Sequence, residues 1–215
     1  MAYYFPEGSK FYFSNTLAAA KAVTAVSNAA PAVATCVAHG FADNDELLFT
    51  SGWEDATDSV FKADQLTADT FGLLGLNSVN TSFYPSGSGS GTVQKITNWT
   101  EIPQVLTIST NGGDARFTTI EPLAKRNSIN VPTGFNAMSV SVTMGHDPAN
   151  ANYQQMVDIA RGLSKVAFKM VLSGGAVAYG YGYMSVNEAP SLNRNQANQV
   201  TAALTFLGRF MSYAS

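Results

Sequence analysis

The feature that most constrains the fold is a strict alternation of small polar and apolar residues in the second half of the chain. In the run SVSVTM, residues 139–144, hydroxyl side chains occupy every odd position and apolar side chains every even position. Successive side chains of a strand point to opposite faces of a sheet, so this run predicts a strand with one wet and one buried face. The second half is therefore expected to contain a sheet that is covered on one side.

Extended patterns recur along the chain, whereas helical periodicity is scarce. The turn signal Ser173-Gly174-Gly175 joins two of these patterns into a hairpin. Further strands are predicted at 33–37, 46–51, 59–66, 70–76, 92–99, 166–172, 176–186 and 200–210. We predict a mainly β fold, sandwich-like or barrel-like within the α+β class, with one principal helix.

That principal helix is predicted near residues 148–164, where apolar residues recur at spacings of three and four. Asp147 and Pro148 form a typical helix start, with Asp147 as the expected cap. A second, Ala-rich stretch from Leu17 to Ala30 predicts a short helix that ends at Pro31.

Composition excludes several classes of protein. Only 13% of residues are charged, and the 12 Lys and Arg residues form no patch in the sequence, so tight nucleic-acid binding is not expected. The single cysteine, Cys36, has no internal disulfide partner. The start of the chain lacks a basic leader with an apolar core, and no apolar run reaches the roughly 20 residues of a membrane span. We expect a cytosolic product with no membrane partner.

The glycine-rich run SGSGSGT, residues 86–92, does not match a phosphate-binding loop. A dinucleotide fingerprint needs glycine where Thr92 stands, and the lysine of a P-loop would have to come earlier than Lys95. The run is interpreted as a flexible connection between sheet elements.

Catalytic and metal-binding patterns are weak. Cys36 and His39 lie three residues apart and leave open a thiol hydrolase, although a buried thiol and a loop histidine explain them more simply. Two histidines in the whole chain are too few for a zinc site. We expect no enzyme activity, cofactor or metal.

Tyr179, Tyr181 and Tyr183 fall on one face of the predicted strand at 176–186, with Gly180 and Gly182 on the other face. Alternating glycines mark a strand that another backbone or a closed sheet approaches closely, which favours packing or sheet closure. An aromatic ladder also binds sugar rings. A carbohydrate-binding module or adhesin therefore remains the alternative function.

The segments AHGFADNDELLFTSGW, TADTFGLLGLN and FYPSGSGSGTVQKI resemble the tail tube, or major tail, proteins of long-tailed bacteriophages. The resemblance runs from about Asn28 to Ile102. One departure concerns the turn before residue 46, where relatives often have Gly-Asp and this chain has Asn44-Asp45.

The resemblance implies a virion structural protein that forms stacked, sixfold rings whose sheets join into one continuous inner β-barrel. Its partners would be further copies of itself, the tape measure, tail terminator and distal tail proteins, and genomic DNA passing without specific binding. The chain would be one domain, 1–215, assembled in the host cytoplasm and located in the phage tail. An aromatic N-terminal arm at 1–14 and a loop or protruding hairpin near 110–134 would connect subunits. The candidate interface residues are Tyr3, Tyr4, Phe5, Phe11, Tyr12, Phe13, Lys125, Arg126 and Asn127.

Overall fold

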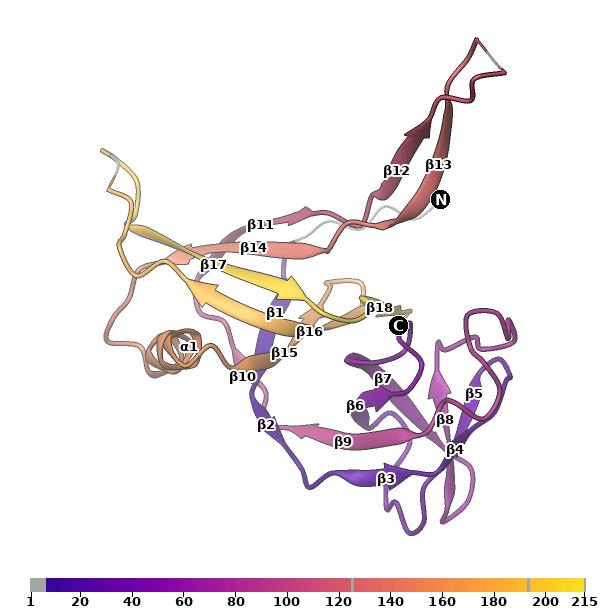
Figure 1. Cartoon of the computed structure of the whole chain (residues 1–215). Coiled ribbons are helices and arrows are strands. Elements are labelled where there is room, and N and C mark those ends of the chain that lie inside the picture. The colour runs from indigo at the N-terminus through magenta and orange to yellow at the C-terminus, as the bar shows by residue number, and fades with distance from the viewer. Residues whose placement is uncertain (1–6, 125, 193, 215) are drawn as a thin grey trace.

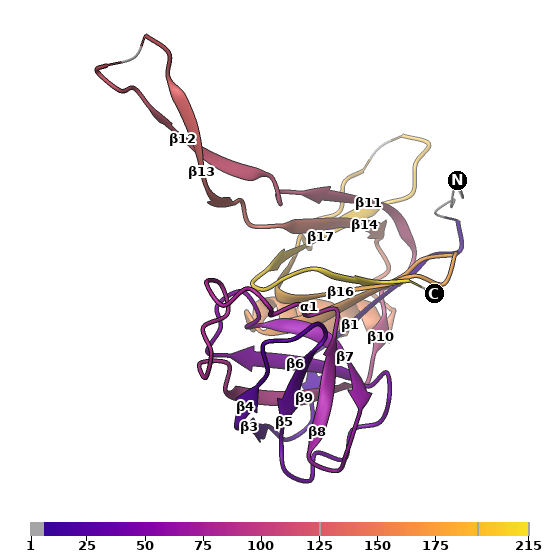
Figure 2. The same cartoon turned by 90° about the vertical axis from the view of Figure 1, so that its right-hand side faces the viewer.

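A computed structural model describes residues 7–124, 126–192 and 194–214 and contains two β bodies (Figures 1 and 2). The first body, in indigo to magenta, is a small barrel. The second is a curved main sheet from which a two-stranded ribbon projects. The predicted mainly β fold with one principal helix is confirmed.

The small barrel is closed by one segment that pairs on both sides. β3 (Lys21–Val23) pairs with β9, and β4 (Ala25–Val26), one residue later, pairs with β5. The rest of the circuit runs through antiparallel neighbours, so the hydrogen-bonded ladder goes all the way round. Its other strands are β5 (Ala32–Thr35), β6 (Glu46–Ser51), β7 (Ser59–Gln65), β8 (Thr70–Leu74) and β9 (Gly91–Thr97), with β2 (Thr16–Leu17) paired to β9.

The barrel core follows from the period of two along each strand. On β6, Leu47 and Phe49 point into the barrel while Leu48 points out, and on β7 Phe61 points in while Val60 points out. The inward set is fully buried. The barrel therefore has its own apolar interior and a partly apolar exterior.

One prediction was wrong for the segment that contains β3 and β4. The stretch Leu17–Ala30 is not a helix but contains β2, β3 and β4. Alanine favours helix only weakly, and Val23, Thr24 and Val26 favour strand. Pairing with β9 and β5 outweighs the local preference.

The glycine-rich run 86–92 was predicted to be a flexible connection between sheet elements, but part of it is closely packed. A Cβ on Gly89 would lie 2.8 Å from the Trp53 ring, and Gly91, already in β9, lies against the Thr50 carbonyl. Trp53 in turn donates from its indole nitrogen to the Pro85 carbonyl, at 2.8 Å. The run is packed closely around a buried tryptophan, so its glycines provide room as well as freedom.

The main sheet has the strand order β10-β1-β15-β16-β17-β14-β11, all antiparallel, with β18 also paired to β16. It includes the hairpin predicted around Ser173-Gly174-Gly175. The bounds are β1 (Lys10–Ser14), β10 (Thr100–Glu101), β11 (Val105–Asn111), β14 (Ser139–Gly145), β15 (Lys165–Val171), β16 (Val177–Val186), β17 (Gln199–Phe206) and β18 (Met211–Tyr213).

Helix α1 (Ala151–Arg161) covers one face of the main sheet. It buries Met156 and Ile159 in an apolar cluster that also contains residues of β14, β15, β16 and β17, and it lies closest to β16. Its cap is Asn150 rather than the predicted Asp147: the Asn150 side chain accepts from the backbone nitrogens of Asn152 and Tyr153, at 2.9 and 3.3 Å. The helix leaves the opposite face of the sheet to the barrel and to solvent.

Candidate functional site

The strand β11 forms one margin of the main sheet. Its residues pair with β14 on one side, and among the described residues no strand pairs with its other side. Leu106, at a bulge in this strand, is 49% exposed. An edge of unpaired backbone groups is a template for another strand, so this margin is able to bind a further chain.

The main sheet curls until its first strand, β1, approaches β11. A hollow of about 520 Å³ separates the two. Its apolar lining comes from Phe11 of β1 and from Val105, Leu106 and Ile108 of β11, and its polar lining from Glu7, Ser9 and Thr107. Phe11 and Ile108 are only partly buried against the core. The sheet thus has a seam, with both apolar and polar walls, where a closed barrel would have a strand pair.

A ribbon of two strands, β12 (Ala115–Ile120) and β13 (Ile129–Phe135), projects from the end of β11 (Figures 1 and 2). It carries exposed apolar side chains, including Phe117 at 58% and Phe135 at 76%. At its base, Gly113 and Asn136 are joined by a backbone hydrogen bond of 3.1 Å. An isolated two-stranded ribbon is marginal in water, so its apolar surface indicates a partner.

On the face of the main sheet opposite α1, the strands β11, β14 and β17 carry short uncharged side chains. Cross-strand pairs align three rows over β11, β14 and β17: Asn111–Ser139–Thr205, Ser109–Ser141–Ala203 and Thr107–Thr143–Thr201. We call these nine residues the hydroxyl face. All of them are exposed or half-buried.

Nearer the barrel, the same face of the sheet becomes aromatic and buried. Tyr179 and Tyr181 of β16 pack with Leu48, Val60 and Ile96 of the barrel, whereas Tyr183 is 44% exposed. Two of the three tyrosine rings are therefore unavailable for stacking on a sugar, which removes the basis of the carbohydrate-binding alternative.

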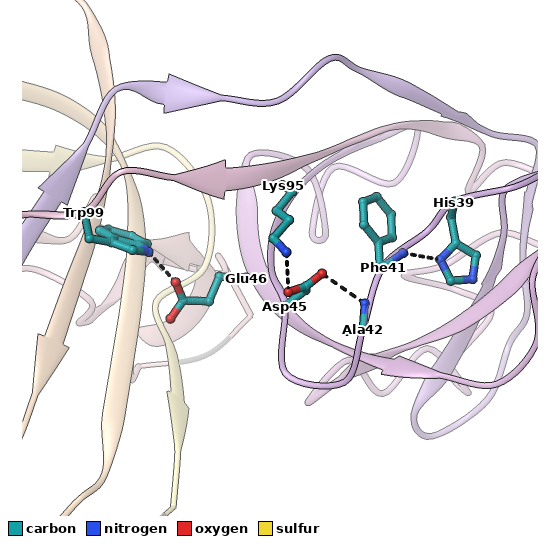
Figure 3. A network of polar contacts seen from close by, with 7 residues as sticks. All are labelled: His39, Phe41, Ala42, Asp45, Glu46, Lys95 and Trp99. Atoms are coloured by element: carbon teal, nitrogen blue, oxygen red, sulfur yellow. Dashed lines mark hydrogen bonds and ion pairs between the residues drawn. The ribbon is translucent and has the colours of Figure 1, made fainter.

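A polar cluster around Glu46 ties the barrel to the main sheet. Glu46 accepts from the Tyr179 hydroxyl at 2.5 Å and pairs with Lys169 at 2.6 Å. It also accepts from the Trp99 indole nitrogen, the one of these contacts drawn in Figure 3. Burial, together with the adjacent carboxylate, raises the pKa of Tyr179. Our sequence reasoning singled out Tyr179 as a packing residue but missed Glu46, Lys169 and Trp99, because these partners are far apart in the sequence and carry no local signal.

The C-terminal strand makes a second tie between the bodies. Tyr213 donates its hydroxyl to the Leu74 carbonyl at 2.8 Å and accepts from the Lys62 backbone nitrogen at 3.2 Å. Burial raises the pKa of Tyr213 to about 12. Since β18 also pairs with β16, this segment fixes the two bodies to each other.

Cys36 and His39 are both buried in the barrel. The His39 Nδ1 accepts from the Phe41 backbone nitrogen at 3.0 Å (Figure 3), which places the ring proton on Nε2, 2.9 Å from the Thr67 carbonyl. Burial raises the pKa of the Cys36 thiol, which disfavours the thiolate. These contacts support the packing interpretation over a hydrolase.

Beside them, the turn before β6 is fixed by Asp45, which accepts from the Ala42 backbone nitrogen at 3.0 Å and pairs with Lys95 at 2.6 Å (Figure 3). Within the described ranges, no group of three His, Cys, Asp or Glu residues is placed to bind a metal ion.

The predicted interface residues fall into different settings. Phe13 is fully buried in the core of its own subunit, so its prediction as an interface residue is corrected: it is a core residue of β1. Tyr12 is half-buried beside Lys169. Arg126 and Asn127 are exposed between the ribbon strands. Tyr3, Tyr4, Phe5 and Lys125 lie outside the described residues.

Two comparisons with known proteins returned a match, and the family model is the one that shows the family. The sequence model of a family described as "Phage tail tube protein, TTP" matches residues 51–215. A solved structure of the SPP1 tail tube, obtained by solid-state NMR and cryo-electron microscopy, aligns at 16% identity and a TM-score of 0.42, covering 55% of this chain and 69% of that chain. No curated protein matches by sequence. None of the helices in the described part of the chain has the length and apolar character needed to cross a membrane.

Proposed function

This chain belongs to the phage tail tube protein family, and from that premise we propose that it polymerises into stacked hexameric rings through which the genome is delivered. It is a structural protein of the virion tail. We further propose that the whole chain, 1–215, acts as one tail-tube domain without catalytic activity. Assembly takes place in the host cytoplasm, with the tape measure, tail terminator and distal tail proteins as further partners.

The observation that carries the proposal is the unpaired margin of β11. Its outer backbone groups have no strand partner among the described residues, and Leu106 and Val105 line the open seam beside it. A strand from a second copy would satisfy these groups and cover Leu106. Repetition of that contact around a ring would join the sheets of the subunits into one inner barrel.

The ribbon supports contacts between copies. Ile120, Ile129 and Val131 lie on one of its faces, with Phe117 on the other, so both faces present apolar area. Arg126 and Asn127, at its exposed end, stay candidates for contacts with the neighbouring ring. Residues Lys10–Ser14 of the predicted N-terminal arm form β1 within the subunit. The part of the arm before Lys10 therefore stays as the proposed contact with other copies.

Electron microscopy of the purified full chain, alone and with an initiating tail complex, tests the proposal. We expect tubes of stacked rings. Phe135→Ser should reduce tube formation because it removes exposed apolar area from the ribbon. The matched control, Val37→Ser, removes a side chain of similar exposure, 72% against 76%, from the barrel and should assemble normally. A chain that stays monomeric under all these conditions would refute the proposal.

A further inference from the structure

The junction between β11 and the ribbon contains the dipeptide Asn111-Gly112, and no other asparagine in the chain is followed by glycine. Asn111 is the last residue of β11 and pairs with Ser139 of β14. It is exposed, and it is the one side-chain amide among the nine residues of the hydroxyl face. A reactive amide thus lies at the end of the margin that the proposed function assigns to contacts between copies.

The backbone nitrogen of Gly112 lies close to the side chain of Asn111. It donates to the Asn111 Oδ1 at 2.8 Å, and the Cγ carbon of Asn111 is bonded directly to that oxygen. A bond between this nitrogen and Cγ would close a five-membered ring. Glycine leaves the approach to Cγ open because it has no side chain.

The structure also explains why the residue after Asn111 is glycine. Gly112 has a φ of +83°, which favours glycine, and a Cβ on it would lie 2.0 Å from the Ala137 carbonyl oxygen. A bulkier residue, which would shield Asn111 from attack, does not fit at this turn. The fold therefore keeps an unhindered nitrogen next to an exposed amide.

We propose that Asn111 is a site of spontaneous deamidation in the free subunit, with water as the co-reactant. The Gly112 nitrogen gives its proton to hydroxide and attacks Cγ, and the bond between Cγ and Nδ2 breaks. The leaving nitrogen takes a proton from water and departs as ammonia, so a succinimide ring remains. Water then adds to one of the two ring carbonyls. Addition at Cγ gives aspartate, and addition at the main-chain carbonyl carbon gives isoaspartate.

Isoaspartate changes both the charge and the length of the chain at the end of β11. Its main chain runs through Cβ and is one carbon longer, and a carboxylate replaces the neutral amide. The added atom disturbs the pairing with Ser139 and the hydrogen bond between Gly113 and Asn136 at the base of the ribbon. Converted subunits are therefore expected to assemble poorly, a consequence that rests on the proposed function. The modification would limit how long a free subunit stays competent for assembly.

Peptide mapping by mass spectrometry tests the modification in the full chain, held in solution at mildly alkaline pH. Asn111 should first lose ammonia and then show a gain of about 1 Da, with isoaspartate identified by fragmentation. Asn136 is the internal control, because it is exposed at the same base of the ribbon but is followed by Ala137. Asn111 should convert at least about tenfold faster than Asn136, since glycine does not hinder the attack. Equal rates at the two residues would overturn the proposal.

Partition between tubes and supernatant tests the effect on assembly. Subunits aged until part of the population is converted are allowed to assemble and are then sedimented. The isoaspartate fraction at residue 111 should be severalfold lower in the tubes than in the supernatant. Asn111→Gln keeps an amide but would need a less favourable six-membered ring, so its aged subunits should assemble as well as its fresh ones.

The outcomes separate the two halves of the proposal from the proposed function. Equal isoaspartate fractions in tubes and supernatant would overturn the effect on assembly, while the modification itself would stand. Fresh wild-type subunits that form no tubes would count against the proposed function, and the peptide map would still decide whether Asn111 is modified.

Discussion

The barrel and the main sheet are both antiparallel, but the hydrogen-bonded ladder closes only in the barrel. In the barrel, the segment of β3 and β4 pairs on both sides, so the subunit closes the ladder by itself. In the main sheet, β1 and β11 approach each other across an open seam, and the outer side of β11 has no strand partner among the described residues. On the function proposed here, the barrel serves the fold of one subunit, and the main sheet offers its margin to other copies.

The largest loss of stability is expected from a substitution inside the closed barrel. Phe61→Ala removes a fully buried ring, and we expect a loss of about 3–5 kcal/mol in the free energy of unfolding. Urea denaturation of the subunit measures it. The exposed control Phe83→Ala should change stability little. A Phe61→Ala subunit as stable as the wild type would contradict the closed, packed barrel.

The second-largest loss of stability is expected at Glu46, whose contacts join the barrel to the main sheet. Glu46→Gln keeps the shape of the side chain but removes its charge from contact with Lys169 and Tyr179, and should cost about 1.5–3 kcal/mol of unfolding free energy. Glu54→Gln, on the exposed surface, is the matched control. Equal stability of the two variants would mean that the cluster does not hold the bodies together.

A smaller effect is expected at Tyr213, and it depends on pH. Its folded pKa of about 12 lies above the unfolded value, so its contribution is complete below about pH 10 and is lost as pH rises toward 12. Tyr213→Phe should cost about 1 kcal/mol near neutral pH and should weaken the alkaline loss of stability. An unchanged pH profile of the denaturation midpoint would argue against this tie.

The smallest effect on the subunit should come from removing the ribbon. Replacing residues 115–135 by a short glycine turn between Asp114 and Asn136 removes almost only exposed side chains, so unfolding free energy should change by less than about 0.5 kcal/mol. Tube formation should nevertheless be lost. Normal tubes from this variant would remove the ribbon from the assembly mechanism.

Sequence reasoning succeeded where the signal was local. The alternation of 139–144 and the spacing of apolar residues in 148–164 each report on a single element, and the structure has β14 and α1 there. It failed at Leu17–Ala30, because strand formation depends on partners in β9 and β5 that local propensity does not reveal.

The same limit applies to the candidate site. Glu46 meets Tyr179 across 133 positions of the chain, and Phe13 is buried in a core that forms because β10 and β15 pair with β1. The aromatic content of the first residues was visible in the sequence. The division between core and surface was set by the sheet order, which no local pattern contains.

The most direct test of the central claim is hydrogen exchange of the β11 backbone amides in free subunits and in assembled tubes. We predict that exchange within Val105–Asn111 slows by at least about tenfold on assembly, while the barrel strands exchange equally in both states. Tubes in which β11 exchanges as fast as in the free subunit would contradict the claim that this margin is completed by a neighbouring copy.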